Sequence, residues 1–206
     1  RVDTVMTVIE FSGGGREELT QRQRYSHYFA IAFGIVGLII GINLRESVRG
    51  ATTQYADTRA GIRAFYPENW LVDTSGADYV FRVQDMAQPG FKTLIQVSMR
   101  PVSVATTTRN VIEQLSLSRL QTLAEYSVSS IEPFTLEDQP EATRVDYAFA
   151  AANNDPFLQT LPTIVRGLDV LTIKRGQAIV ITFRSDSATY EANLATFERF
   201  LDTLEF

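Results

Sequence analysis

The stretch YSHYFAIAFGIVGLIIGINL, from Tyr25 to Leu44, decides how the chain is organised, because it contains no Asp, Glu, Lys or Arg. A helix of this length spans about 30 Å, the thickness of the hydrocarbon core of a bilayer. Lipid offers the backbone no hydrogen bonds, so only a helix suits such a segment. A soluble core helix rarely stays apolar on every face, and a signal peptide has a shorter apolar region before a small-residue cleavage site. Because the charged segment 45–49 follows instead, the sequence predicts a single membrane span over 25–44.

Small residues form a stripe along one face of this predicted helix. Its members are Ala30, Gly34, Gly37 and Gly41. Small side chains let a second helix approach closely, so the stripe predicts a helix-packing face, although glycine is common in membrane helices in general. The aromatic rings at one end of the span favour the membrane interface and are predicted anchors. These anchors are Tyr25, Tyr28 and Phe29.

The segments that flank the span are expected to be an N-terminal tail, 1–24, and a polar connector, 45–60. The apolar start of the tail, 1–11, is expected to lie against a partner or the membrane surface. Arginines occur on both sides of the span, so the positive-inside rule does not fix its orientation. A short tail followed by a large domain is typical of proteins whose domain lies outside the cytoplasm. We therefore expect a single-pass cell-membrane protein with an extracytoplasmic C-terminal domain.

The composition removes several classes of chemistry. The chain has no cysteine and one histidine, His27, which excludes disulfides, thiolate catalysis, a Ser-His-Asp triad and a histidine metal cluster. His27 lies at the membrane boundary, either as a simple helix-end residue or in contact with a cofactor or headgroup of a neighbouring subunit. Glu137, Asp138 and Glu141 lack the glycine-bearing loop of a calcium site and favour a solvated turn. We therefore expect no catalytic, cofactor-binding or metal-ligating residues.

Residues 61–206 carry eighteen acidic and twelve basic side chains, a balance that repels nucleic acid. This region alternates strand and helix patterns. Two short strands flank a turn over 66–69, and Trp70 is expected to enter the core. Further strands are predicted over 79–83, 91–102, 128–136 and 144–149, with a helix over 106–126 and a loop over 153–163. A hairpin is predicted over 168–184, with its turn at Arg175 and Gly176. A closing helix follows, and its apolar stripe is Tyr190, Leu194, Phe197, Leu201 and Leu204. The pattern predicts an α+β domain with a mainly antiparallel sheet covered by helices.

A family resemblance adds to this reading. The strand and turn GIRAFYPENW, from Gly61 to Trp70, followed by a β-meander, one helix, further strands and an amphipathic closing helix over 188–205, resembles the PsbP-like family of photosystem II extrinsic subunits. The resemblance covers about residues 60–206 and implies an α/β/α sandwich that docks on or stabilises a larger assembly. This chain differs by its predicted membrane anchor and by having no histidine in the domain, so no histidine metal site is carried over.

Three functions remain open from the sequence. The first is a non-catalytic, single-span accessory subunit that stabilises or helps to assemble a larger membrane complex, photosynthetic or respiratory. Its partners would be transmembrane helices of other subunits, with pigments or lipids as further candidates for contact at the span. The second is a membrane-anchored extracytoplasmic protein that binds a small ligand or lipid in an apolar pocket. The third is an anchored hydrolase that uses carboxylates alone, which requires paired carboxylates in a cleft.

Overall fold

The computed structural model describes residues 21–136, 139–152 and 161–206. The chain divides into two compact units, residues 1–50 and 51–206. The predicted tail before residue 21, the acidic residues Glu137 and Asp138, and most of the predicted loop over 153–163 lie outside the described residues.

The first unit contains one long helix, α1 (Gln21–Arg49). Its segment from His27 to Arg45 is the only described helix that is long and apolar enough to cross a membrane. Large apolar side chains on all faces of this segment are exposed, including Phe33 at 81% and Leu38 at 65%. The helix predicted over 25–44 is therefore confirmed, and it extends by about one turn at each end.

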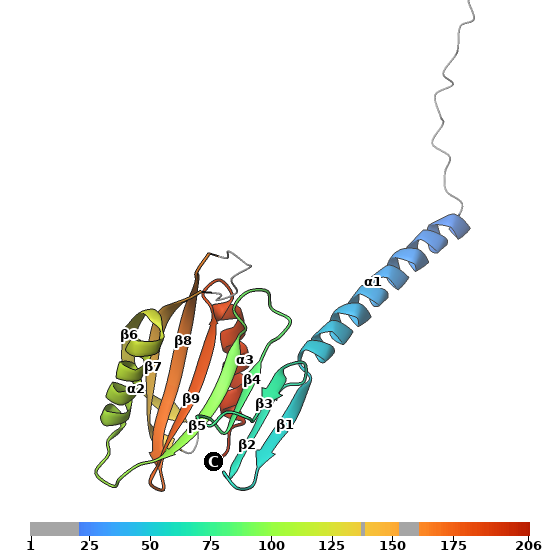
Figure 1. Cartoon of the computed structure of the whole chain (residues 1–206). Coiled ribbons are helices and arrows are strands. Elements are labelled where there is room, and N and C mark those ends of the chain that lie inside the picture. Colours follow the sequence, from blue (N-terminus) through green and yellow to red (C-terminus); the bar gives the residue numbers. More distant parts are fainter. Residues whose placement is uncertain (1–20, 137–138, 153–160) are drawn as a thin grey trace, which may run out of the picture. The chain divides into compact units, whose positions relative to one another are not determined.

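The second unit is built on a seven-stranded antiparallel sheet with the order β3-β4-β5-β9-β8-β7-β6 (Figure 1). The strands are β3 (Leu71–Asp73), β4 (Phe81–Gln84), β5 (Leu94–Pro101), β6 (Ala124–Leu136), β7 (Gln139–Ala151), β8 (Thr163–Lys174) and β9 (Gln177–Asp186). Two meanders thus meet where β5 pairs with β9. Each strand predicted between 79 and 184 is present, with boundaries shifted by a few residues.

A separate two-stranded sheet contains β1 (Thr52–Asp57) and β2 (Ile62–Pro67). The polar connector expected over 45–60 therefore consists of the end of α1 and a strand, and the second unit begins at Ala51 rather than at residue 61. The turn predicted over 66–69 is present, because the Trp70 amide donates to the Pro67 carbonyl at 3.0 Å. Its flanking strands β2 and β3 belong to different sheets, so the turn is a crossing point and not a hairpin.

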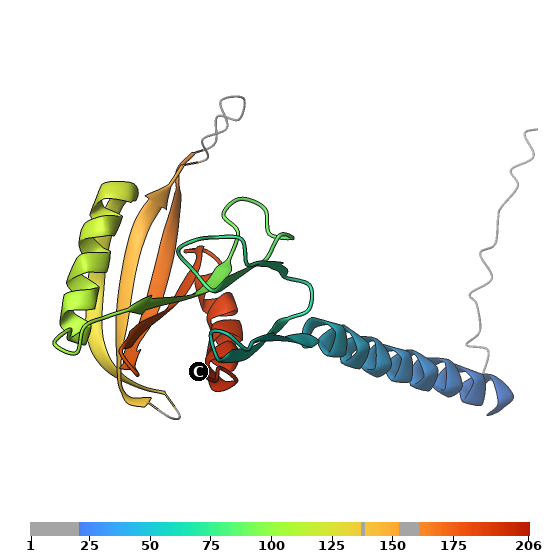
Figure 2. The same ribbon diagram turned by 60° about the horizontal axis from the view of Figure 1, so that its bottom comes forward.

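Helices cover opposite faces of the large sheet, as the two views show: α2 (Thr108–Thr122) on one side and α3 (Tyr190–Asp202) on the other (Figures 1 and 2). Thr107 begins α2 with a capping box, since its side chain accepts from the Asn110 amide while the Asn110 carbonyl oxygen Oδ1 accepts from the Thr107 amide. Of the described helices, none lies over β4 and β5 on the α2 side (Figure 1). Helix α2 thus covers only part of its face of the sheet.

The main core lies between the sheet, α3 and the β1-β2 sheet. Phe197 of α3 stacks on Phe183 of β9 with ring centroids 4.9 Å apart, and Trp70 is 8% exposed. The predicted burial of Trp70 is therefore confirmed. So is the α3 stripe, which is buried at Tyr190, Phe197 and Leu201 and partly buried at Leu194 and Leu204.

The hairpin of β8 and β9 is the central part of the sheet. Its two-residue turn places Arg175 at φ 51° and Gly176 at φ 73°, the pair of positive values that a type I′ turn requires. Glycine adopts this conformation without strain, which explains why the sequence marked the turn. Side chains on both faces of β9 are buried, which fits its central place in the sheet.

Candidate functional site

Polar side chains form a row across the α2 side of the large sheet. The antiparallel register aligns one residue from each of five successive strands: Asp73, Arg82, Gln96, Thr182 and Asp169. Since successive residues of a strand point to opposite faces, all five project toward the same side. We call this set the polar row, and it runs from the sheet edge at β3 to the strands beneath α2.

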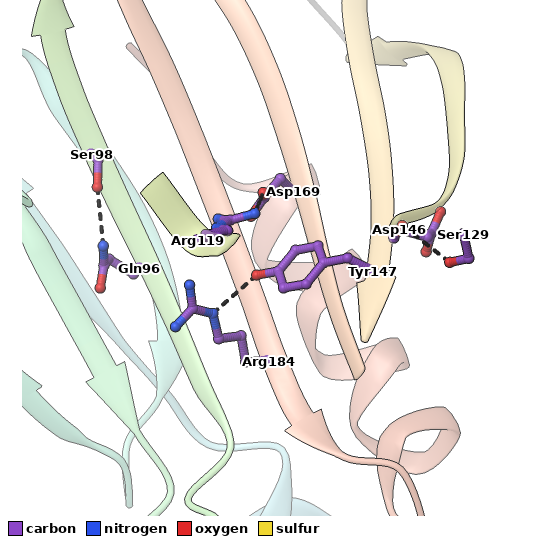
Figure 3. A network of polar contacts seen from close by, with 8 residues as sticks. All are labelled: Gln96, Ser98, Arg119, Ser129, Asp146, Tyr147, Asp169 and Arg184. Carbon is purple, nitrogen blue, oxygen red and sulfur yellow. Dashed lines mark hydrogen bonds and ion pairs between the residues drawn. The ribbon is translucent and has the colours of Figure 1, made fainter. Parts of the chain in front are cut away.

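One end of the polar row is a buried ion pair. Arg119 of α2 contacts both carboxylate oxygens of Asp169 in β8, with Nη2 to Oδ1 at 3.0 Å, and the two residues are 8% and 1% exposed (Figure 3). Burial lowers the pKa of Arg119, but the charge of Asp169, the neighbouring Tyr147 and the hydrogen bonds to the guanidinium together raise this pKa above its ordinary value. The pair fixes α2 on the sheet.

Tyr147 of β7 lies beside this ion pair. The Arg119 guanidinium stacks over its ring at 4.3 Å, and the ring crosses over Gly167 of β8, where an added Cβ atom would come within 2.2 Å of ring carbon Cζ. Glycine at this position therefore lets the tyrosine lie flat across the neighbouring strand. Burial raises the pKa of the Tyr147 hydroxyl, so the group keeps its proton.

Arg184 of β9 meets the Tyr147 hydroxyl from the other side. Its Nε donates to Tyr147 Oη at 3.0 Å, and its guanidinium carbon lies 5.5 Å from the centre of the Phe149 ring (Figure 3). Gln96 of β5 is a near neighbour, because it is paired with Thr182, two residues before Arg184 on the same face. The Gln96 amide donates to Ser98 Oγ at 3.1 Å. Figure 3 also shows Ser129 donating to the backbone carbonyl of Asp146 at 3.0 Å.

The opposite end of the polar row is a closed turn around Asp73. Its carboxylate accepts from Ser75 Oγ at 2.6 Å, from Tyr79 Oη at 2.5 Å and from Arg82 Nη2 at 2.7 Å. The hydrogen bonds from Ser75, Tyr79 and the Ser75 amide hold the pKa of Asp73 well below its usual range. All of its strong donors are local, so this cluster stabilises the β3-β4 connection.

An apolar surface lies at the edge of the sheet where α2 meets β6. Its exposed members are Leu117, Leu120, Val128 and Ile131, and we call it the α2-β6 surface. A shallow groove of about 450 Å³ adjoins it, lined by Arg109, Ile112, Glu113, Ile131 and Thr143. Within α2, the side chain of Leu120 does not pack on the sheet and is 59% exposed. Arg119 occupies the sheet-facing position instead, because Asp169 lies beneath it.

The predicted helix-packing residues of the span share one exposed face of α1. Cβ atoms built at Gly34, Gly37 and Gly41 meet nothing within 4 Å, and Ala30 is exposed. The predicted anchors Tyr25, Tyr28 and Phe29 are 68%, 68% and 78% exposed. Their roles toward lipid or a partner helix stay predictions.

Carboxylates and histidine do not gather into a metal site in the described part of the chain, where no group of three or more such side chains lies close enough to hold an ion. Glu141 is exposed at the start of β7, and its sequence neighbours Glu137 and Asp138 are not described. His27 is exposed on α1. Sequence reasoning missed the polar row, whose only trace was polar residues at alternate positions of otherwise apolar strands.

Comparison with known proteins identifies the fold of the second unit. No protein-family model and no curated protein sequence matches the chain. The solution structure of cyanobacterial PsbP (CyanoP) from Synechocystis sp. PCC 6803 matches with a TM-score of 0.57 and 14% identity, covering 75% of this chain and 92% of that one. The mixed helix and sheet content and the antiparallel order agree with this similarity.

Two further solved structures match more weakly. LpqN, described as involved in cell envelope biogenesis of Mycobacterium tuberculosis, has a TM-score of 0.48 and 11% identity over 75% of this chain and 89% of its own. The Ran-binding protein Mog1p of Saccharomyces cerevisiae has a TM-score of 0.48 and 10% identity over 75% and 95%. At these identities only the fold is informative, and the chain combines a PsbP-like α+β domain with one N-terminal apolar helix.

Proposed function

We propose that the protein is a non-catalytic, single-span accessory subunit that stabilises or helps to assemble a larger membrane protein complex, photosynthetic or respiratory. The observation that supports it most is the exposed small-residue face of α1, at Ala30, Gly34, Gly37 and Gly41. Lipid tails are as apolar as leucine, so the hydrophobic effect does not bring helices together within a bilayer. Close backbone approach does, and small residues permit it.

The α2-β6 surface supports a second contact, made by the domain. Exposed Leu117, Leu120 and Ile131 suit a protein partner with an apolar centre. A lipid surface is a poorer partner, because binding to anionic lipid needs clustered Lys and Arg, whereas the Arg109 beside this surface is already paired with Glu113 at 3.0 Å. The acidic balance of residues 61–206 also opposes an anionic membrane.

Co-purification of the full chain after mild detergent extraction tests the proposal. Replacing Gly37 and Gly41 together with leucine is expected to reduce recovery of partner subunits at least tenfold, because leucine keeps the helices apart. The matched control replaces Ile35 and Ile39 with leucine on the opposite face and leaves recovery unchanged. The Trp70 fluorescence maximum reports that the domain stays folded in both variants, since Trp70 is the single, buried tryptophan.

Two results would contradict the proposal. Wild-type recovery of partners with the double glycine variant would remove the packing role of the small-residue face. If the intact chain extracted at native expression level brings no other membrane protein at constant stoichiometry, the accessory role itself is wrong.

The alternative function is a membrane-anchored extracytoplasmic protein that binds a small ligand or lipid. It is favoured by the groove next to the α2-β6 surface, which has apolar side chains of Ile112 and Ile131 in its lining. The groove is open rather than deep, so a bound acyl chain would remain largely in water. Native mass spectrometry of the detergent-extracted chain distinguishes the two functions by the mass that accompanies it.

A further inference from the structure

Arg184 is the exception among the arginines that are at least partly buried. Four others each hold a carboxylate, in the pairs Arg82–Asp73, Arg119–Asp169, Arg144–Asp146 and Arg166–Glu191. No carboxylate of the described residues lies within 4.0 Å of the Arg184 guanidinium, and Asp186, two residues further on the same face of β9, instead caps the following turn through the Ala188 amide at 2.9 Å. A partly buried guanidinium commonly has an anionic partner, so this one indicates an anion from outside the chain.

The hydrogen bonds around Arg184 leave donors free on the sheet face. Nε is used by Tyr147 Oη, whereas the two Nη groups donate to no described residue. Because the Tyr147 oxygen accepts from Arg184, its own proton is available to another acceptor, and no described residue accepts it. The two Nη groups are therefore donors without an acceptor, and the Tyr147 hydroxyl, on a side chain that is 2% exposed, holds the guanidinium in place.

The surroundings of these donors are apolar and aromatic. Leu94 is the cross-strand neighbour of Arg184 on β5, and Gly167 is its neighbour on β8. The Phe149 ring lies 5.5 Å from the guanidinium carbon and packs edge to face with Phe91, at 6.1 Å between centroids. A ligand that places an anionic group on Arg184 would therefore bring its remaining atoms against aromatic rings and Leu94.

We propose that Arg184, held in place by Tyr147 and with Gln96 at its side, binds the carboxylate of a small organic acid that has an apolar or aromatic body. The end of a guanidinium presents two parallel donors that match the two oxygens of a carboxylate. A phosphate dianion fits less well, because the amine of the nearby Lys92 donates to the backbone carbonyls of Met86 and Gln88, and the other partly buried arginines of the described residues are paired with carboxylates. This site is distinct from the α2-β6 surface and from the small-residue face of α1, so it goes beyond the accessory function.

Arginine side-chain NMR on the full chain in a maltoside detergent tests the site. Benzoate is the probe, and the Nε–Hε resonance of Arg184 is assigned by its loss in Arg184→Gln. Benzoate is expected to shift this resonance saturably with a Kd of about 1 mM, typical of a ligand of so few atoms. Tyr147→Phe keeps the ring packing and removes the hydroxyl that holds Nε of Arg184, so it should weaken binding at least fivefold. Arg184→Lys keeps the positive charge but removes the two parallel donors of the guanidinium, so it should weaken binding by a similar factor.

Exposed Arg199 provides the matched control, since Arg199→Gln should leave benzoate affinity unchanged. Three results would overturn the proposal: no saturable shift at Arg184, equal shifts of Arg184 and the exposed arginines, or inorganic phosphate binding as tightly as benzoate. Unfolding midpoints of the variants verify that each is folded, and Arg184→Lys supplies a conservative second test if Arg184→Gln is unstable.

Discussion

At the level of single residues, the buried ion pair of Arg119 and Asp169 links α2 to the large sheet. Removing one member of such a pair leaves the other charge buried without a partner, whereas removing both leaves an apolar gap. Asp169→Ala is therefore expected to lower the free energy of unfolding by about 3–5 kcal/mol. Replacing both residues by Leu should cost clearly less. Urea unfolding of the full chain in detergent, followed by Trp70 fluorescence, measures both, and equal losses would show that the charges do not act as a pair.

A second prediction at this scale concerns Gly167. The Tyr147 ring occupies the space that a side chain at position 167 would need. Gly167→Ala is expected to displace the ring and to cost about 1–3 kcal/mol, as overpacking does. The same substitution in a Tyr147→Ala background should cost much less, since the ring is gone. Equal costs in the two backgrounds would locate the strain in the backbone of β8 instead of at the ring.

Asp73 predicts a dependence of stability on pH. Its folded-state pKa is depressed, so its carboxylate stabilises the domain above the unfolded-state pKa of 3.8, and this contribution is lost as the pH falls through the folded-state pKa. The difference in urea midpoint between the native chain and Asp73→Asn should therefore be largest above about pH 5 and should shrink toward pH 2. A difference that stays constant over this range would contradict the assignment.

Single residues also show what sequence patterns can and cannot predict. Burial of Trp70 was predicted because a large aromatic ring follows a strand and a proline turn. Burial of Arg119 was not, although it lies four and seven residues after Leu115 and Ile112 and so shares their helical face. Charge argued for exposure there, and only the position of Asp169 in the folded sheet reverses that argument.

Among the elements, α3 is the one whose packing the sequence described most fully. Phe197 is 1% exposed and stacks on Phe183. Phe197→Ala is expected to cost about 3–5 kcal/mol, because it removes a buried ring and leaves a cavity. Phe65, which is 40% exposed, is the matched control, and Phe65→Ala should cost much less. If Phe197→Ala lowers the free energy of unfolding as little as Phe65→Ala does, α3 contributes little to the core.

Strand β1 shows why one element was missed. Its sequence, TTQYAD, is mostly polar, and its side chains are exposed or partly buried. Pairing with β2 makes it a strand, and the partner's hydrogen bonds are not visible in the local pattern. The hairpin turn at Arg175 and Gly176 was predicted because its requirement for positive φ is local.

For the whole molecule, the proposed topology places residues 51–206 outside the cytoplasm and the N-terminal tail inside. Protease added to intact spheroplasts should then remove the domain and leave α1 with its tail in the membrane fraction. Reporter tags before residue 21 and after Phe206 distinguish the two fragments on a blot. Protection of the C-terminal tag until the membrane is opened would reverse the orientation.

The class of fold was predictable, and the strand order was not. Alternating apolar residues predicted antiparallel strands, and helical stripes predicted the covering helices. The polar row is assembled from five strands, so its members share no short sequence motif. Its existence depends on the register of β5 against β9, which are separated by α2 and three strands.

That same pairing has a consequence for biosynthesis. The β3-β4-β5 meander is translated first, but its buried edge receives no partner until β9 has followed from the ribosome, about 4–15 s after β5 at about 5–20 residues per second. During this interval β5 presents unpaired backbone groups and apolar side chains such as Ile95 and Val97. In a nascent chain arrested before residue 177, the edge of β5 is therefore free to pair with strands of other chains. The native sheet is completed only when β9, the last strand, has emerged.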